Sequence, residues 1–162
     1  MLIGILGDTH DQRERTRRAV GMLRDGGAEA LFHCGDLTGP EIVEELAPLP
    51  CWFVFGNNDC DAVPDLRRAA VAQGVNCLEW GGQIALAGKR IALVHGHLNS
   101  DLRPLLRDQP DYLFSGHSHA VNDRWEGVTR RINPGALHRA DSYTVALLDL
   151  VTEELRFLTV PR

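Results

Sequence analysis

The sequence predicts an α/β fold in which one domain, residues 1–162, holds two β-sheets. In the first half, short apolar strands alternate with helical segments, a pattern that favours parallel strands joined by right-handed crossovers. In the second half, strands follow one another with turns between them, as expected for a second, strand-rich sheet. No linker, low-complexity tract or internal repeat divides the chain. A single domain is therefore the economical interpretation.

Each element of the first half has a local signal. The apolar run at 2–6 has the length of a strand, and Gly26-Gly27 ends the helical spacing of apolar residues that follows it. Pro40 suits the first turn of the next helix, and Pro48 ends that helix. The elements expected in this half are strands at 2–6, 30–34 and 51–55 and helices at 12–25, 40–47 and 65–73.

The second half is expected to consist mainly of strands. Two apolar runs, 83–87 and 90–95, flank Gly88-Lys89, which is a good candidate for a hairpin turn. The remaining elements expected here are a helix at 103–108 and strands at 111–114, 124–133, 142–150 and 154–160.

The composition limits the class of protein. Hydrophobic residues make up 44% of the chain and charged residues 24%, a globular balance with no apolar stretch long enough to span a bilayer. The N-terminal segment lacks a basic leader, so we expect a soluble, cytoplasmic protein. The net charge is −5 and basic residues are dispersed, which argues against an extensive nucleic-acid-binding surface. No CxxC pair is present to form a zinc ribbon. Strand-rich halves with exposed edges often pair, so the sequence leaves a homodimer open without fixing the oligomeric state.

Residues that commonly bind metals follow five of the expected strands. Open α/β sheets place their sites just beyond the carboxyl ends of strands, so these loops are expected to converge in one crevice. Five of the seven histidines fall in them. In chain order the residues are Asp8 and His10 in GDTH, Asp36 in GDL, Asn57, Asn58 and Asp59 in GNND, His95 and His97 in HGH, and His117 and His119 in GHSH.

Each of these residues also has an ordinary structural explanation when it is considered alone. An aspartate beside glycine commonly caps a turn or a helix, and Asn57-Asn58 suits a turn. Metal binding is favoured for the set as a whole, because so many candidate ligands gather in these loops. Carboxylate, imidazole and amide ligands without thiolate suit manganese, iron, zinc, nickel or cobalt. Seven ligands are enough for two ions that share one carboxylate.

The motifs DTH, GD, GNND, HGH and GHSH, followed by INPGA at 132–136, resemble in their order those of the calcineurin-like metallophosphoesterase superfamily. The chain looks most like the small single-domain branch of bacterial and archaeal phosphodiesterases. This resemblance implies a four-layer αββα sandwich of two mixed β-sheets flanked by helices. It also implies two divalent transition-metal ions, with manganese favoured over nickel, cobalt, iron and zinc. By matching motifs, the first ion would be held by Asp8, His10 and His119, the second by Asn57, His95 and His117, and both by a bridging Asp36.

The resemblance implies hydrolysis of small phosphodiesters, or of phosphomonoesters, by in-line attack of a hydroxide that bridges the two ions. The expected catalytic residues are Asp36, Asn58 and His97. Many larger members of the superfamily have histidine where this chain has Asn58, and asparagine cannot supply a proton at neutral pH. Esters with acidic leaving groups are therefore expected to react fastest. His97 is expected to face the pocket beside His95, and donation to a backbone carbonyl is its alternative.

Several assignments keep an alternative. The retromer complex has a scaffold subunit of the same fold with a degraded metal site, but this chain keeps all seven ligands, which favours an enzyme. A metal-dependent hydrolase that cleaves a bond other than a phosphate ester is a weaker third hypothesis. A pH switch formed by His117 and His119 would leave the aspartates unexplained. Asp59 either orients an imidazole or caps its own turn. Arg13 and Arg139, near the expected mouth, either steer phosphate or are simply solvated, and solvation is favoured.

Overall fold

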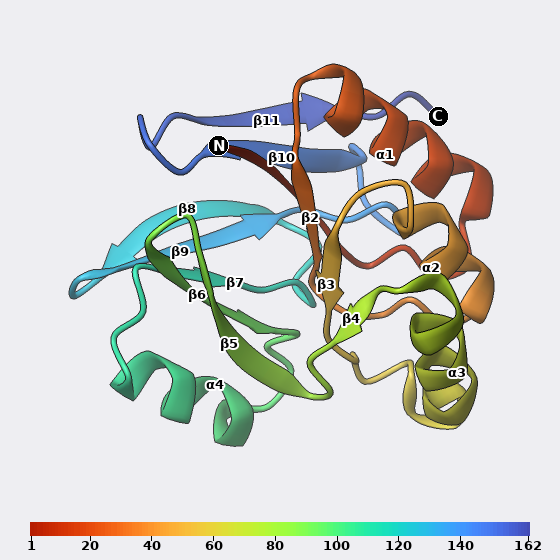
Figure 1. Cartoon of the computed structure of the whole chain (residues 1–162), viewed down its shortest axis with the longest axis horizontal. Helices are drawn as coiled ribbons and strands as arrows, with labels where there is room; N and C mark the ends of the chain where they lie inside the picture. The colour runs from red at the N-terminus through yellow and green to blue at the C-terminus, as the bar shows by residue number, and fades with distance from the viewer.

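The computed structural model describes residues 1–162 and contains two β-sheets packed face to face between layers of helices (Figure 1). The first sheet contains, in spatial order, β11 (Leu155–Thr159), β10 (Thr144–Asp149), β1 (Leu2–Leu6), β2 (Ala30–His33), β3 (Cys51–Phe53) and β4 (Asn76–Cys77). The second contains β5 (Gly81–Leu86), β6 (Lys89–Val94), β7 (Tyr112–Phe114), β9 (Thr129–Pro134) and β8 (Val121–Glu126). The helices are α1 (Arg13–Asp25), α2 (Pro40–Leu46), α3 (Val63–Gln73), preceded by the short 3-10 helix η1 (Cys60–Ala62), and α4 (Asn99–Arg107).

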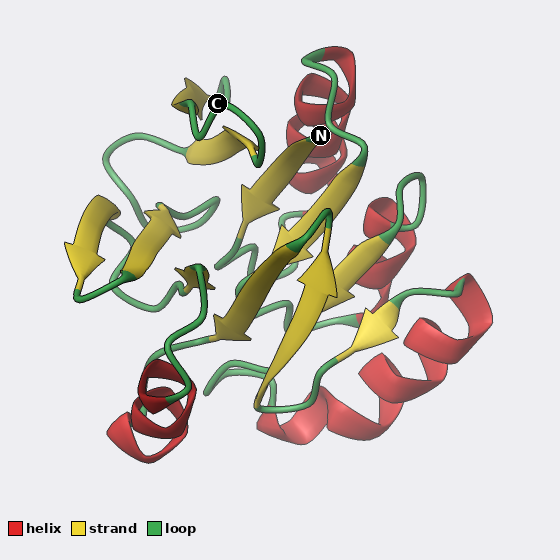
Figure 2. Ribbon diagram, turned by 60° about the vertical axis from the view of Figure 1, so that its left-hand side comes forward, coloured by secondary structure: helices red, strands yellow, loops and turns green.

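The four layers follow from the alternation of side chains along the strands. In β1 and β2, Ile3 and Phe32 face the second sheet, whereas Leu6 and Leu31 belong to the apolar layer beneath α1, α2 and α3. In β6, Ala92 and Val94 face the opposite way, toward the leucines of α4. Figure 2 shows the helices on the two outer sides of the strands. The expected αββα sandwich is confirmed.

Both sheets are mixed, and their parallel strands matter most for function. Strands β1, β2 and β3 run parallel in the first sheet, and β6, β7 and β9 run parallel in the second. The pairs β1–β10, β5–β6 and β8–β9 are antiparallel. Because parallel strands end at the same edge, the loops that follow them lie close together.

The second half differs in detail from the expected elements. The expected strand at 124–133 is a hairpin, because Gly127, with φ of 61°, turns the chain between β8 and β9. The turn between β5 and β6 is at Ala87-Gly88, where both residues have positive φ, so Lys89 already pairs with Leu86. Helix α4 starts at Asn99 and contains Pro104, whereas the helix was expected to start at 103. None of the helices has the length and apolar character needed to span a lipid bilayer.

Candidate metal centre

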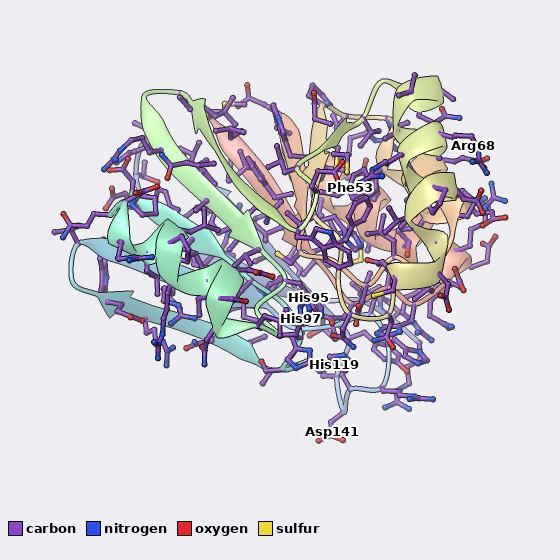
Figure 3. All side chains as sticks on the ribbon, turned by 90° about the horizontal axis from the view of Figure 1, so that it is seen from below. Phe53, Arg68, His95, His97, His119 and Asp141 are labelled. Atoms are coloured by element: carbon purple, nitrogen blue, oxygen red, sulfur yellow. The ribbon has the colours of Figure 1, made fainter.

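The predicted ligands lie in loops at the carboxyl ends of β1, β2, β3, β6 and β7. Three of the five loops come from the first sheet and two from the second, so the ligands meet where the two sheets end. Figure 3 shows His95, His97 and His119 grouped at this end of the molecule. The expected convergence of these loops is therefore present in the structure.

The backbone of these loops adopts a conformation that is uncommon for residues other than glycine. Asp8, His10, Asp36, His117 and His119 all have positive φ, between 42° and 68°. Such residues cost free energy and cluster at functional sites, where the surrounding structure holds them in place. Five of the seven expected metal ligands share this feature.

Two glycines allow the backbone to approach the carboxylates. A Cβ atom at Gly56 would lie 2.1 Å from Asp36 Oδ1, and one at Gly116 would lie 2.5 Å from Asp8 Oδ2. Neither distance is compatible with a side chain. The glycines of GNND and GHSH therefore have a steric reason to be glycine.

Asp8, His10 and His119 form the first group of ligands. Their ligand atoms all lie within 4.8 Å of one another, and His119 Nε2 is 3.2 Å from Asp8 Oδ1. His10 Nε2 is buried and forms no hydrogen bond, although Asp36 Oδ2 lies 3.3 Å from it. A buried nitrogen without a partner is costly in a folded protein, and a metal ion would satisfy it.

His95 and Asn57 belong to the second group of ligands, next to Asp8 and Asp36. Asp8, Asp36 and His95 have ligand atoms within 4.8 Å of one another, and His95 Nε2 is 3.1 Å from Asn57 Oδ1. The ring of His117 is 5.2 Å from that of His95, measured between centroids. All seven expected ligands are thus brought together by the fold.

Asp36 lies between the two groups. Its Oδ2 atom is 3.3 Å from His10 Nε2 and 3.4 Å from His95 Nε2. Asp8 also belongs to both sets of ligand atoms, so the two groups share carboxylates. This is the arrangement expected of a residue that serves two ions.

The two other expected catalytic residues occupy different surroundings. Asn58 donates from its backbone N–H to Asp36 Oδ1 at 2.9 Å and from Nδ2 to Asp36 Oδ2 at 2.8 Å. His97 lies beside His95 and 6.4 Å from the ring of Trp80, and its buried Nδ1 has no partner. It does not line the pocket over the ligands. The catalytic roles of Asn58 and His97 stay predictions.

Backbone carbonyls orient two of the imidazoles. His95 Nδ1 is 2.8 Å from the carbonyl oxygen of Cys34, and His119 Nδ1 is 3.3 Å from that of Arg139. Because a carbonyl only accepts, Nδ1 of each ring donates its hydrogen there. Nε2 then keeps its lone pair and points toward the aspartates, as a metal ligand requires.

Two buried residues support the loops without facing the pocket. Asp59 accepts hydrogen bonds from the backbone N–H groups of Gly56, Asp36 and Thr38, at 2.7 to 2.9 Å. It therefore holds the loops together and orients no imidazole. His33 accepts from the backbone of Gly35 and contacts the Thr9 hydroxyl at 3.1 Å. Burial lowers the pKa of His33 to about 3, so this ring is neutral.

The electrostatics of the centre are those of buried acids without a permanent positive partner. Burial raises the pKa of Asp8 to about 6, although His95 and His119 oppose the shift. Burial also raises the pKa of Asp36, but contacts with His10, His95 and Asn58 lower it more, so its net pKa lies below the usual range. No lysine or arginine forms a salt bridge with either carboxylate.

These observations test whether the residues fit a divalent metal. Asp8 and Asp36 are 0% and 1% exposed, and burying such carboxylates without a cation is unfavourable. The surrounding donors are imidazole nitrogens and an amide oxygen, which suit divalent first-row metals. The donor set, the unpartnered His10 Nε2 and the two buried charges all fit a metal centre.

A pocket of about 410 Å³ lies over the ligands, and no apolar side chain lines it. Three of its residues were not among the expected site residues: Thr38, His138 and Arg139. The ring of His138 packs 4.7 Å from that of His10. His138 and Arg139 follow β9, which runs parallel to β7 and ends at the same edge. A sequence prediction that β9 runs parallel to β7 would have placed the loop after INPGA among the expected site loops.

Comparison with known proteins identifies relatives over almost the whole chain. The model of the calcineurin-like phosphoesterase superfamily domain matches residues 1–153. A phosphodiesterase of Methanocaldococcus jannaschii is 26% identical over 162 residues, covering 96% of this chain and 97% of its own. A probable metallophosphoesterase of Methanothermobacter thermautotrophicus is 32% identical over 148 residues, covering 84% of this chain and 77% of its own.

Solved structures share the fold. An archaeal phosphodiesterase superposes with a TM-score of 0.87 at 25% identity and covers 99% of this chain and 100% of its own. Vps29 of Entamoeba histolytica, complexed with zinc, superposes with a TM-score of 0.60 at 19% identity, covering 99% of this chain and 98% of its own. The similarity to Vps29 concerns the fold alone.

Proposed function

Because the chain belongs to the calcineurin-like phosphoesterase superfamily, we propose that it is a phosphodiesterase that uses two divalent metal ions. Residues 1–162 then form a single metallophosphoesterase domain. The first ion is held by Asp8, His10 and His119, the second by Asn57, His95 and His117, and Asp36 serves both. Manganese is the favoured metal, ahead of nickel, cobalt, iron and zinc.

The position of Asp36 carries this proposal. Its Oδ2 atom lies 3.3 Å from His10 Nε2 and 3.4 Å from His95 Nε2, so one carboxylate faces imidazoles of both groups. A pair of divalent ions supplies Lewis acidity and lowers the pKa of water toward neutrality. That chemistry suits the hydrolysis of phosphate esters.

The protein's own residues orient the centre. The carbonyls of Cys34 and Arg139 fix the rings of His95 and His119, and the backbone N–H of His117 donates to Asp8 Oδ2 at 3.1 Å. Asn58 holds Asp36 through two hydrogen bonds and retains a second amide N–H. Because Asn58 cannot protonate a leaving group, aryl phosphodiesters should react faster than alkyl ones.

The test is hydrolysis of bis(p-nitrophenyl) phosphate by metal-stripped protein to which single metals are returned. Activity should return with manganese or another of the named metals, and Asp36→Asn should lower kcat about 10²–10³-fold, since it removes one of the charges that organise the centre. A dialkyl phosphate, assayed in parallel, should react far more slowly. If no metal restores hydrolysis, or if Asp36→Asn is as active as the parent, the dinuclear proposal is wrong.

A protein-binding scaffold of the same fold is the alternative, because Vps29 shares this architecture. The complete set of ligands favours the enzyme. The scaffold alternative gains if the protein binds two metals and leaves a broad panel of phosphate esters intact.

A further inference from the structure

Arg139 is the one residue with a permanent positive charge among those that line the pocket over the metal ligands. The other lining residues are histidines, asparagines, Thr38 and Asp36. A substrate phosphoryl group brings negative charge into this pocket, and a guanidinium binds phosphate with a fork of N–H donors.

The guanidinium of Arg139 has no partner within the protein. Its side chain forms no salt bridge and no hydrogen bond, whereas its backbone carbonyl accepts a hydrogen bond from His119. Arg13, which also lies near the site in sequence, differs: it contacts Glu45 Oε1 at 2.7 Å and Glu44 Oε2 at 2.9 Å. Of these two arginines, only Arg139 is free to bind an anion.

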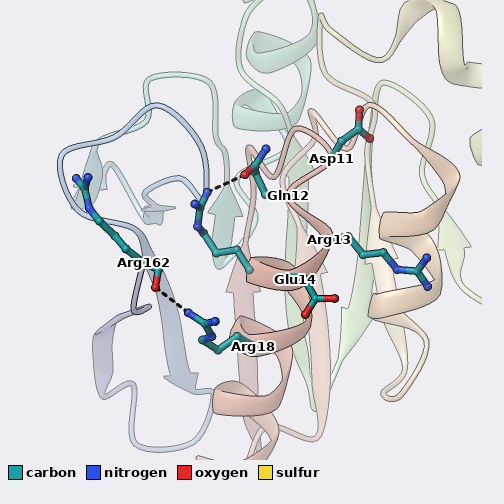
Figure 4. Close-up of a pocket in the computed structure, with 7 residues that line it drawn as sticks. Asp11, Gln12, Arg13, Glu14, Arg18 and Arg162 are labelled. Atoms are coloured by element: carbon teal, nitrogen blue, oxygen red, sulfur yellow. Dashed lines mark hydrogen bonds between the residues drawn. The ribbon is translucent and has the colours of Figure 1, made fainter.

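The backbone around Arg139 is fixed to the metal centre. The N–H of Leu137 donates to the carbonyl of Asp8 at 3.2 Å, and the Arg139 carbonyl accepts from His119. On the other side, Arg15 donates to the Leu137 carbonyl at 2.5 Å and is held by Gln12, as the upper dashed line in Figure 4 shows.

The conformation of Arg139 also indicates a constrained position. Its φ is 44°, which is uncommon for a residue other than glycine and costs free energy. The start of the same loop is tightly packed, because a Cβ atom at Gly135 would lie 1.9 Å from Thr144 Oγ1. The base of the Arg139 side chain is thus held at the edge of the pocket.

Asn58, the other candidate for a phosphate contact, is already engaged. Its Nδ2 donates to Asp36 Oδ2 at 2.8 Å, and its backbone N–H donates to Asp36 Oδ1. One amide hydrogen remains for a substrate, with no formal charge. Among the side chains that line the pocket, Arg139 is therefore the one permanently charged donor for phosphate.

We propose that Arg139 binds a non-esterified oxygen of the substrate phosphoryl group and favours dianionic phosphomonoesters relative to monoanionic phosphodiesters. The inference rests on the proposed phosphoesterase function. A monoester carries nearly two negative charges at neutral pH and three non-esterified oxygens, whereas a diester carries one charge and two such oxygens. A guanidinium at the pocket therefore stabilises the monoester more.

The experiment compares p-nitrophenyl phosphate with bis(p-nitrophenyl) phosphate, which share one leaving group, on the metal-loaded protein. Arg139→Gln should lower kcat/KM for the monoester about 10- to 100-fold, the range expected for a lost charge-assisted hydrogen bond, and lower it less for the diester. Inhibition by inorganic phosphate should weaken in the same variant. Arg139→Lys, which keeps the charge and loses the fork, should recover part of the monoester activity.

The matched control is Arg107→Gln. Arg107 is also exposed and forms no salt bridge, but it ends α4 and does not line the metal pocket. It should leave both activities and the inhibition by phosphate unchanged. Thermal unfolding of each variant checks that the fold is kept.

The possible results distinguish a failure of the role inferred for Arg139 from a failure of the proposed phosphoesterase function. Equal losses for both esters, or unaltered phosphate inhibition in Arg139→Gln, would overturn the role of Arg139 while leaving the enzyme intact. A wild-type protein that hydrolyses neither ester would instead overturn the proposed function. A selective loss for the monoester, partly restored by lysine, supports the inference.

Discussion

The two β-sheets bring different chemistry to the metal centre. Loops of the first sheet supply both carboxylates, Asp8 and Asp36, and the amide of Asn57, with His10 as their one imidazole. Loops of the second sheet supply His95, His117 and His119 and no carboxylate. The loops of the first sheet therefore supply negative charge without enough neutral ligands, and the loops of the second sheet supply neutral ligands without charge. Neither sheet holds a complete set of ligands for either of the two proposed ions.

The apolar layer between the sheets holds these two sets of loops together. Phe32 of β2 and Phe114 of β7 pack edge to face, with ring centroids 5.3 Å apart. Phe114 stands just before the GHSH loop, and Phe32 just before the loop that carries Asp36. Packing between the sheets should therefore set the distance between carboxylates and imidazoles.

The largest expected effect comes from loosening that layer. Phe114→Ala should lower the free energy of unfolding by about 3–5 kcal/mol, because it removes a fully buried ring and leaves a cavity. It should also weaken metal binding. Leu113→Ala is the control, since Leu113 is equally buried but packs under α4. Denaturant unfolding and metal titration measure both quantities; equal loss of metal affinity in the two variants would contradict the coupling.

The next prediction separates the two ion positions. His117→Ala and His119→Ala should each lower the affinity for one of the two metal equivalents by at least about 10–100-fold. Losing only a residue that hydrogen-bonds to a metal ligand already lowers metal affinity by this factor. Metal titration followed by calorimetry gives the number of tight equivalents. His138→Ala, which packs on His10 without being an expected ligand, should keep both. The double variant should lose both equivalents; if it retains one, the two histidines serve the same ion.

The smallest expected effect concerns Asp8, a carboxylate from the first sheet, and the stability of the metal-free protein. Burial raises the pKa of Asp8 to about 6 in the metal-free protein, against an ordinary value of 3.8. The folded state thus binds this proton more tightly than the unfolded chain, and the resulting stability is lost as the pH rises through 6. At pH 7, Asp8→Asn should therefore stabilise the metal-free protein by about 1–3 kcal/mol.

Urea unfolding with a chelator present, between pH 4 and 8, measures this difference. The advantage of Asp8→Asn should grow as the pH rises, and it should reverse when metal is added, because the carboxylate is then a ligand. An Asp8→Asn protein that is no more stable than the parent at pH 7 would show that other charges already balance Asp8.

Much of the site was predictable because its loops follow strands that are recognisable by their apolar runs. Asp8, Asp36 and His117 each follow such a run beside a glycine, and metal-ligand types at strand ends are a local signal. Arg139 was judged a solvated surface residue because nothing local distinguishes it from Arg13. Their different partners, glutamates for one and none for the other, depend on which helix packs beside each loop.

The α/β class, the order of the ligand-bearing loops and the chemical types of the ligands follow from the sequence, because periodicity, glycines and donor atoms are local properties. The hairpin within 124–133 and the parallel pairing of β9 with β7 appear only in the folded chain. The same is true of the position of Asp36, which faces both His10 and His95, and of the unpaired Arg139 at the pocket. These features depend on contacts between residues far apart in the chain, and such contacts arise only when the two sheets pack together.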